Sequence, residues 1–224
     1  MWKWKQLFWP IVASLLLIGI SYYNCYSEDT MINKIQKTQE IPYTEPEFDS
    51  TAKQIGDTVY FPIWSHISGS DTLALWKTLY IAKYKKLNKL HIYINSGGGS
   101  AFDGLGLCDV LLAAQKDGFE VVTEANGLVA SAAVPIFVVG QKRIASPGTI
   151  FMIHEAQLFK FLSEEKKGDL ISQTRMIELL ENRYNELIAK RSKLSVKELQ
   201  EKCKETTWFT AQQALEWGLV DVIK

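Results

Sequence analysis

The order of apolar and polar positions divides the chain into three parts. Residues 7–23 form an apolar run without a charged side chain, residues 27–56 are polar, and strand-like and helix-like patterns alternate over residues 57–224. An apolar run of this length is close to the shortest helix that can span a bilayer. The pattern predicts an N-terminal membrane anchor at residues 1–26, a linker at residues 27–56 and one folded domain at residues 57–224.

The residues that flank the apolar run also favour an anchor. Tryptophans precede it and tyrosines follow it, as in the aromatic belts at membrane interfaces. A cleaved signal peptide is the alternative, but such a segment ends in small residues, whereas this run ends in Tyr22 and Tyr23. Lipid attachment at Cys25 is a weaker alternative for the same reason. Lys3 and Lys5 precede the run, so the positive-inside bias predicts a single-pass membrane protein with an extracytoplasmic domain.

Within the predicted domain, strand-like and helix-like segments follow one another in turn. Strands are expected at residues 58–64, 90–95, 120–125, 143–145, 149–153 and 219–223, and helices at residues 70–88, 102–115, 131–139, 163–191, 196–204 and 211–217. Strands that alternate with helices need crossover connections, which favour parallel strand pairs. The sequence therefore predicts an α/β fold around a largely parallel sheet.

The helix expected at residues 70–88 has an apolar stripe. Its members recur at spacings of three and four residues: Leu73, Trp76, Tyr80, Tyr84 and Leu87. This spacing marks one face of an α-helix. The lysines of the same segment are expected on the solvated side and at the C-terminal end, where they complement the helix dipole.

The composition argues against several classes of function. Lysine and arginine total 25 and aspartate and glutamate total 25, so there is no net charge to attract nucleic acid. Cys25, Cys108 and Cys203 are far apart and form no CxxC pair, which indicates neither a disulfide framework nor a zinc site. We therefore expect no nucleic-acid partner, no metal and no cofactor.

Three features between residues 94 and 156 carry the candidate chemistry. The run Gly97–Gly99 follows a predicted strand, Ser131 stands where a strand passes into a helix, and His154 follows another strand. Each has an ordinary structural explanation: a tight turn, a helix N-cap and a strand-end histidine. The glycine run matches neither GxGxxG nor a P-loop. Together the three supply exposed amides, a nucleophile and a base, which are the groups that acyl transfer needs.

Six short motifs occur in an order and at spacings that resemble those of one known family. They are Asn95-Ser-Gly-Gly-Gly-Ser, Ala130-Ser-Ala, Met152-Ile-His, Arg183-Tyr-Asn-Glu-Leu, Phe209-Thr-Ala and Ala214-Leu-Glu-Trp-Gly-Leu-Val-Asp. Through them, residues 59–224 resemble the proteolytic subunit of the Clp protease. The resemblance implies a ClpP/crotonase-like fold, which is a spiral of ββα units. It also implies a serine endopeptidase that cuts unfolded proteins or peptides and assembles into homo-oligomeric rings.

The resemblance also implies roles for individual residues. By position, Ser131 corresponds to the nucleophile and His154 to the general base. The backbone amides of Gly98 and Ala132 correspond to the oxyanion hole. The family segment that contacts an ATPase is replaced here by the anchor and linker, so an ATPase partner is not expected.

The third member of the catalytic triad is the main departure from the family. Thr206 stands where the family has an acidic residue, and Glu205 is one position earlier. A triad acid orients the histidine ring and stabilises its cation. Glu205 is the candidate substitute, and a neutral hydrogen bond from Thr206 or from a water is the alternative.

Other functions remain open from the sequence. A Ser/Lys dyad, as in related membrane-anchored signal-peptide peptidases, would use Lys166 or Lys167 as the base after a drop in its pKa. A scaffold that has lost catalysis would explain the missing acid. A crotonase-type acyl-CoA enzyme would share the fold, but Ser131 and His154 favour a peptidase.

Overall fold

The computed structural model describes residues 45–157 and 166–224, and residues 46–224 form one compact unit. The predicted anchor at residues 1–26 and most of the predicted linker lie outside the described residues. Across the described ranges, no helix has the length and apolar character needed to cross a membrane. The membrane anchor therefore stays a prediction from the sequence.

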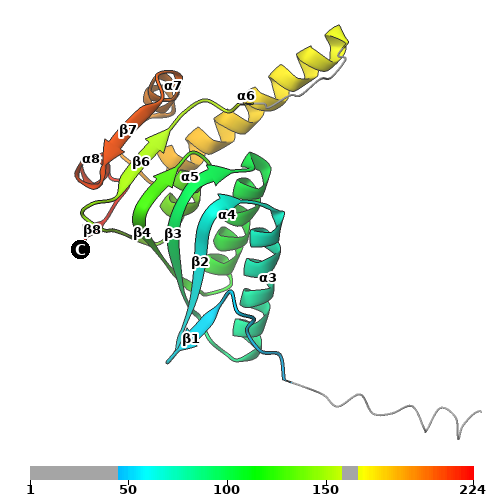
Figure 1. The fold of residues 1–224 in the computed structure, drawn as a ribbon, viewed down its shortest axis with the longest axis vertical. Coiled ribbons are helices and arrows are strands. Elements are labelled where there is room, and N and C mark those ends of the chain that lie inside the picture. Colours follow the sequence, from blue (N-terminus) through cyan, green and yellow to red (C-terminus); the bar gives the residue numbers. More distant parts are fainter. Residues whose placement is uncertain (1–44, 158–165) are drawn as a thin grey trace, which may run out of the picture. The chain divides into compact units, whose positions relative to one another are not determined.

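An eight-stranded sheet forms the centre of the unit (Figure 1). Its strands are β1 (Lys53–Ile55), β2 (Thr58–Ile67), β3 (Lys89–Gly99), β4 (Glu120–Ala130), β5 (Lys142–Ala145), β6 (Ile150–Ile153), β7 (Thr207–Thr210) and β8 (Val222–Ile223). The spatial order is β1-β2-β3-β4-β5-β8, and β6 pairs with β4 and β7. Only the β1–β2 and β6–β7 pairs of this sheet are antiparallel, so the predicted largely parallel sheet is confirmed.

Helices connect the strands and pack beside them. They are α3 (Gly69–Tyr84), α4 (Ala101–Lys116), α5 (Ala133–Val138), α6 (Lys167–Ala189), α7 (Val196–Lys204) and α8 (Ala211–Glu216). Figure 1 shows α3 and α4 side by side against one face of the sheet. The predicted alternation of strands and helices is confirmed. The short strands β1 and β7 were not expected, and β1 lies within the range assigned to the linker.

The core lies between the sheet and these helices. Along β3 and the first six residues of β2 every second residue is buried, as the two-residue period of a strand requires. The alternating residues of the same strands are half-buried or exposed on the opposite face. Phe61, Ile63 and Ile92 are almost fully buried, and burial of each such side chain contributes roughly 1.5–3 kcal/mol.

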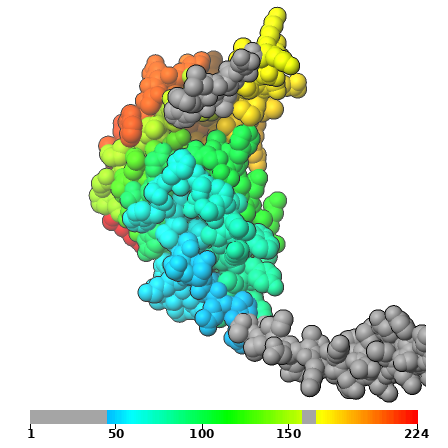
Figure 2. All heavy atoms as spheres, turned by 45° about the vertical axis from the view of Figure 1, so that its right-hand side comes forward, coloured from blue at the N-terminus to red at the C-terminus, as the bar shows by residue number. Residues whose placement is uncertain are grey.

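The apolar stripe expected on α3 does not face this core. Leu75 and Leu79 are buried, whereas Trp76 and Tyr80 of the stripe are 57% and 61% exposed. The two exposed rings stack on each other with centroids 6.1 Å apart. α3 lies on the side of the molecule that Figure 2 brings forward. The periodicity correctly predicted helix α3. It did not distinguish the apolar face with Leu75 and Leu79, which meets the sheet, from the exposed face with Trp76 and Tyr80.

β4 changes its neighbour part-way along its length. Residues 122–125 pair with β5 and residues 128–130 pair with β6. Between these two pairings the register with β3 shifts, and Gly127 has a φ of +80°. The side-chain oxygen of Asn95 accepts a hydrogen bond from the Leu128 amide at 3.1 Å, which stabilises the irregularity. The end of β4 is thereby directed toward β6.

Arg143 is a buried cation that joins the C-terminal segment to β5. Its side chain is 9% exposed, and its Nε donates to Asp221 Oδ2 at 3.0 Å. A second nitrogen, Nη1, donates to the Gly218 carbonyl at 2.9 Å. Burial opposes ionisation of Asp221, but the hydrogen bonds and charge of Arg143 outweigh it and lower the pKa of the carboxyl.

The Asp221→Asn substitution should lower the free energy of unfolding by about 1–3 kcal/mol near pH 7, because Arg143 then stays buried without a counter-charge. A carboxyl whose pKa is lowered by folding stabilises the fold above its unfolded pKa of about 3.9. Its contribution is lost as the pH falls through the lower, folded pKa. Urea unfolding should therefore show a large difference in the free energy of unfolding between wild type and Asp221→Asn near pH 7. Near pH 3 this difference should be small.

Asp117→Asn is the matched control, because Asp117 pairs with Lys83 at the surface and is 50% exposed. Asp117→Asn should change the free energy of unfolding by no more than about 0.5 kcal/mol. Equal losses for the two variants near pH 7 would contradict the assigned role of Asp221 as the counter-charge of the buried Arg143 side chain.

Candidate active site

Ser131 lies between the end of β4 and the start of α5. Its backbone φ is +55°, a conformation that costs a residue with a side chain roughly 1–2 kcal/mol. Its amide donates to the Met152 carbonyl at 2.8 Å, and its carbonyl accepts from the Val134 amide at 3.0 Å. The N-cap of α5 is Ala132, so Ser131 is not a capping residue. Strain of this kind is characteristic of functional positions.

His154 follows β6 directly and is half-buried. Because β6 pairs with the end of β4, Met152 lies beside Ala130, and the residues that follow each strand come close together. The His154 Nε2 atom lies 2.7 Å from Ser131 Oγ, within hydrogen-bond distance. The structure thus brings together the predicted nucleophile and base.

The glycine run is the end of strand β3 and not the tight turn considered from the sequence. Gly98 and Gly99 continue β3 and pair with His66 and Ile67 of β2. Gly98 has a φ of +95°, and a Cβ atom at this position would lie 2.7 Å from Ser131 Cβ. Only glycine allows the backbone of β3 to approach the serine this closely.

The two predicted oxyanion-hole amides differ in their hydrogen bonding. The Gly98 amide donates to Ser96 Oγ at 3.1 Å, so it already has an acceptor. For the Ala132 amide, the described part of the chain provides no acceptor. A built Cβ on Gly98 would lie 3.1 Å from Ala132 N, which places the two residues side by side next to Ser131. Sequence reasoning did not identify Ser96.

Glu205 and Thr206 are both exposed and follow α7. The antiparallel pairing of Ile153 with Thr207 places Thr206 opposite His154 in register. Within residues 45–157 and 166–224, the hydrogen bond to Ser131 is the one that His154 makes, and neither Glu205 nor Thr206 contacts its ring by hydrogen bonding. The structure therefore places Thr206 where the family motif implied, without an acidic partner for His154.

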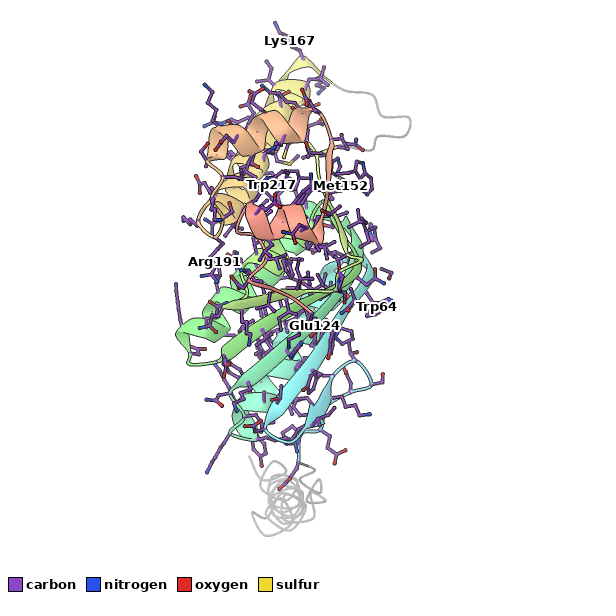
Figure 3. All side chains as sticks on the ribbon, turned by 90° about the vertical axis from the view of Figure 1, so that its left-hand side faces the viewer. Trp64, Glu124, Met152, Lys167, Arg191 and Trp217 are labelled. Atoms are coloured by element: carbon purple, nitrogen blue, oxygen red, sulfur yellow. The ribbon has the colours of Figure 1, made fainter. Side chains whose placement is uncertain are left out.

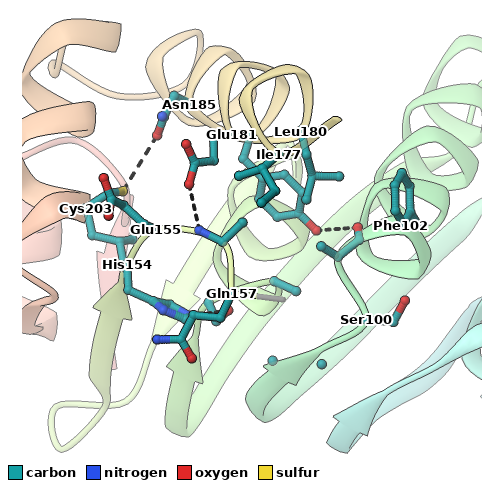
Figure 4. A pocket seen from close by; sticks show the side chains of 18 of the residues that line it. Ser100, Phe102, His154, Glu155, Gln157, Ile177, Leu180, Glu181, Asn185 and Cys203 are labelled. Carbon is teal, nitrogen blue, oxygen red and sulfur yellow. Dashed lines mark hydrogen bonds between the residues drawn. The ribbon is translucent and has the colours of Figure 1, made fainter. Parts of the chain in front are cut away.

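Ser131 and His154 open into a cavity of about 940 Å³ (Figure 4). One side is formed by residues 97–102, the other by residues 153–157, and α6 closes it with Ile177 and Leu180. We call the space between residues 97–102 and 153–157 the groove. Cys203 also lines it, but burial raises its pKa to about 11, so its thiol stays protonated near neutral pH.

Lys166 and Lys167 lie apart from the groove. Both are exposed at the start of α6, and neither lines the cavity that contains Ser131. Figure 3 shows Lys167 at the outer end of the helix. A catalytic lysine needs burial to lower its pKa, and neither side chain has it.

A sequence model of the family described as Clp protease matches residues 62–224. The chain belongs to the Clp protease family. The resemblance inferred from the six motifs is thereby confirmed. That this Clp-family chain is membrane-anchored remains a prediction, because residues 1–26 lie outside the described ranges.

Individual Clp proteins are similar over most of the domain. The ATP-dependent Clp protease proteolytic subunit of Bacteroides fragilis is 31% identical over 147 residues, which covers 65% of this chain and 68% of that protein. The same subunit of Bacteroides thetaiotaomicron is 31% identical over 147 residues and is covered to 64% of its length. The solved structure of a ClpP1 mutant from Listeria monocytogenes shares the fold, with a TM-score of 0.64 and 23% identity over 74% of this chain and 90% of that chain.

The close approach of Gly98 to Ser131 in this Clp-family domain can be tested with Gly98→Ala and Gly56→Ala. Both positions have a positive φ, which should cost either variant roughly 1–2 kcal/mol. A Cβ at Gly56 meets open space, whereas a Cβ at Gly98 overlaps Ser131 and should add about 1–3 kcal/mol. Urea unfolding measures both losses. Similar losses for the two variants would show that the strand end does not approach the serine closely.

Proposed function

We propose that this protein is a serine endopeptidase that hydrolyses peptide bonds in unfolded proteins or peptides. The observation that carries the proposal is the distance of 2.7 Å between Ser131 Oγ and His154 Nε2. Membership of the Clp protease family supports the same chemistry. A nucleophile within hydrogen-bond reach of a base is the signature of covalent acyl-transfer catalysis.

In the proposed reaction, Ser131 Oγ attacks the scissile carbonyl while His154 Nε2 takes the hydroxyl proton. His154 then gives this proton to the leaving amine, and an activated water releases the acyl group from Ser131. The Ala132 amide is free to donate to the oxyanion. The Gly98 amide must exchange Ser96 Oγ for the oxyanion, because it donates to that hydroxyl in this structure.

The strand pattern around the groove supports an extended peptide as substrate. β4 lies between β3 and β6, but it ends at Ala130 while β3 continues to Gly99. Beyond Ala130 the sheet therefore has an unfilled position between the end of β3 and residues 154–157. A peptide bound there in extended form would take the place of the missing strand and pass beside Ser131.

The proposed assembly is a homo-oligomeric ring held to a membrane by residues 1–26. The exposed stripe on α3, with Trp76 and Tyr80, supports a subunit contact, because large aromatic side chains in one exposed patch are typical of interfaces. The apolar run at residues 7–23 and the two lysines before it support the anchor and an extracytoplasmic domain. We propose no ATPase partner and no nucleic-acid partner.

A fluorophosphonate probe should label the purified protein at Ser131. Ser131→Ala should abolish labelling, and His154→Ala should reduce the labelling rate by at least 100-fold, because the serine then has no base. Lys166→Ala and Lys167→Ala should leave it unchanged. Intact-protein mass spectrometry measures the adduct. A folded wild type that is not labelled would favour the non-catalytic scaffold, and loss of labelling in the lysine variants would favour the Ser/Lys dyad.

The missing acid can be tested by Thr206→Asp. An aspartate opposite His154 should orient the ring and stabilise its cation, and we expect kcat on a fluorogenic peptide to rise at least tenfold. Glu205→Gln tests whether Glu205 replaces the missing acid. A loss of kcat of tenfold or more would assign the role of the third triad member to Glu205. If neither substitution changes kcat, no acid acts at this end of β7.

A further inference from the structure

We propose that Glu181 and Tyr184 are positioning residues that hold the two sides of the groove at a fixed separation. Both belong to α6, and each contacts the backbone of one side. Figure 4 shows Glu181 beside the segment that carries His154 and Glu155. The inference rests on the proposed peptidase function, because it concerns the groove in which the peptide would bind. Neither residue touches Ser131 or His154 by hydrogen bonding, so neither is a catalytic residue.

Glu181 holds the side that carries the histidine. Its Oε1 atom accepts a hydrogen bond from the Ala156 amide at 2.8 Å, two residues after His154. The Glu155 amide donates to the Cys203 carbonyl at 3.2 Å. β6 ends at Ile153, so beyond that residue these two hydrogen bonds replace the strand pairing. A hydrogen bond to a charged carboxylate is stronger than one between neutral groups, which makes Glu181 the firmer of the two attachments.

Tyr184 holds the side that carries the glycines. Its hydroxyl donates to the carbonyl of Ala101 at 2.6 Å, and Ala101 is the first residue of α4, two residues after the end of β3. The hydroxyl lies against Gly104, where a built Cβ would be 2.5 Å from the hydroxyl oxygen. Burial raises the pKa of Tyr184, so the hydroxyl stays protonated and able to donate at all physiological pH values.

The two side chains lie one turn apart on α6, and this spacing puts them on the same face of the helix. The same helix is fixed to the domain by the buried side chains of Leu187 and Ile188. α6 therefore spans the groove as a rigid connection between its two sides. His154 belongs to one side of the groove, and Gly98 of the other side lies against Ser131, where a built Cβ would be 2.7 Å from Ser131 Cβ. The alignment of Ser131 with His154 therefore depends on that separation, and a displacement of about 1 Å can lower a rate by as much as 100-fold.

Turnover of a fluorogenic peptide by the full-length protein tests the contact made by Glu181. Glu181→Leu should lower kcat about tenfold with a smaller change in KM, because the histidine side of the groove loses its attachment. Glu181→Gln keeps an acceptor oxygen and should retain at least half of the wild-type kcat. Glu178→Leu is the matched control, since Glu178 is an exposed glutamate on the same helix outside the groove, and it should leave kcat unchanged.

Tyr184→Phe removes only the hydroxyl and should lower kcat about threefold to tenfold. If both residues fix one separation, the Glu181→Leu/Tyr184→Phe double variant should lose less than the product of the two single losses. Strictly multiplicative losses would mean that the two contacts act independently and would overturn the proposal. An unchanged kcat in Glu181→Leu would overturn it as well.

Hydrogen exchange followed by mass spectrometry tests the contacts without relying on turnover. In Glu181→Leu, peptides that contain residues 154–157 should exchange at least fivefold faster than in the wild type, whereas Glu181→Gln and Glu178→Leu should match the wild type. Unchanged exchange in Glu181→Leu would overturn the positioning role. A wild type that shows protected exchange but neither labelling nor turnover would instead contradict the proposed function.

Discussion

β4 has to pair with different neighbours along its length, and the position of every candidate catalytic group depends on this. Its first half lies beside β5 and its last residues lie beside β6. The irregularity at Asn95 and Gly127 makes the change of partner possible without leaving the Leu128 amide unpaired. Without the change, Ser131 would follow a strand next to β5, and His154 would belong to a separate edge of the sheet.

An aromatic cluster supports strands β6 and β7, which lie beside the end of β4. Phe151 of β6 packs between Phe137 and Phe209, with both centroid distances at 5.4 Å, and Phe209 contacts Trp217 at 4.7 Å. These rings fill the space under β6 and β7, and aromatic pairs are each worth about 0.5–1.5 kcal/mol beyond their burial. The contribution is of the size needed to offset the unfavourable φ of Ser131.

Much of this arrangement follows from local sequence, and some of it does not. The strands, most helices and the Ser131 and His154 candidates could be predicted, because a residue after a strand in an α/β protein lies at the edge of the sheet. The contacts of Glu181 and Tyr184 could not, because they join residues 25 and 83 positions apart and depend on how α6 is placed. β1 was missed because all three of its residues are exposed, so no apolar alternation marks it. β7 was missed because Phe209 is its single buried residue, which gives no period-two pattern to recognise.

The order of β4, β6 and β7 along the chain has a consequence for newly made protein. Ser131 is synthesised first, and His154 follows, but β6 gains its second neighbour only when Thr207–Thr210 has been added. A growing chain therefore carries the proposed nucleophile for some time before β6, which precedes the proposed base, is supported on both sides. In a peptidase of the proposed kind, the alignment of Ser131 with His154 would therefore have to wait for a strand that is made after both residues.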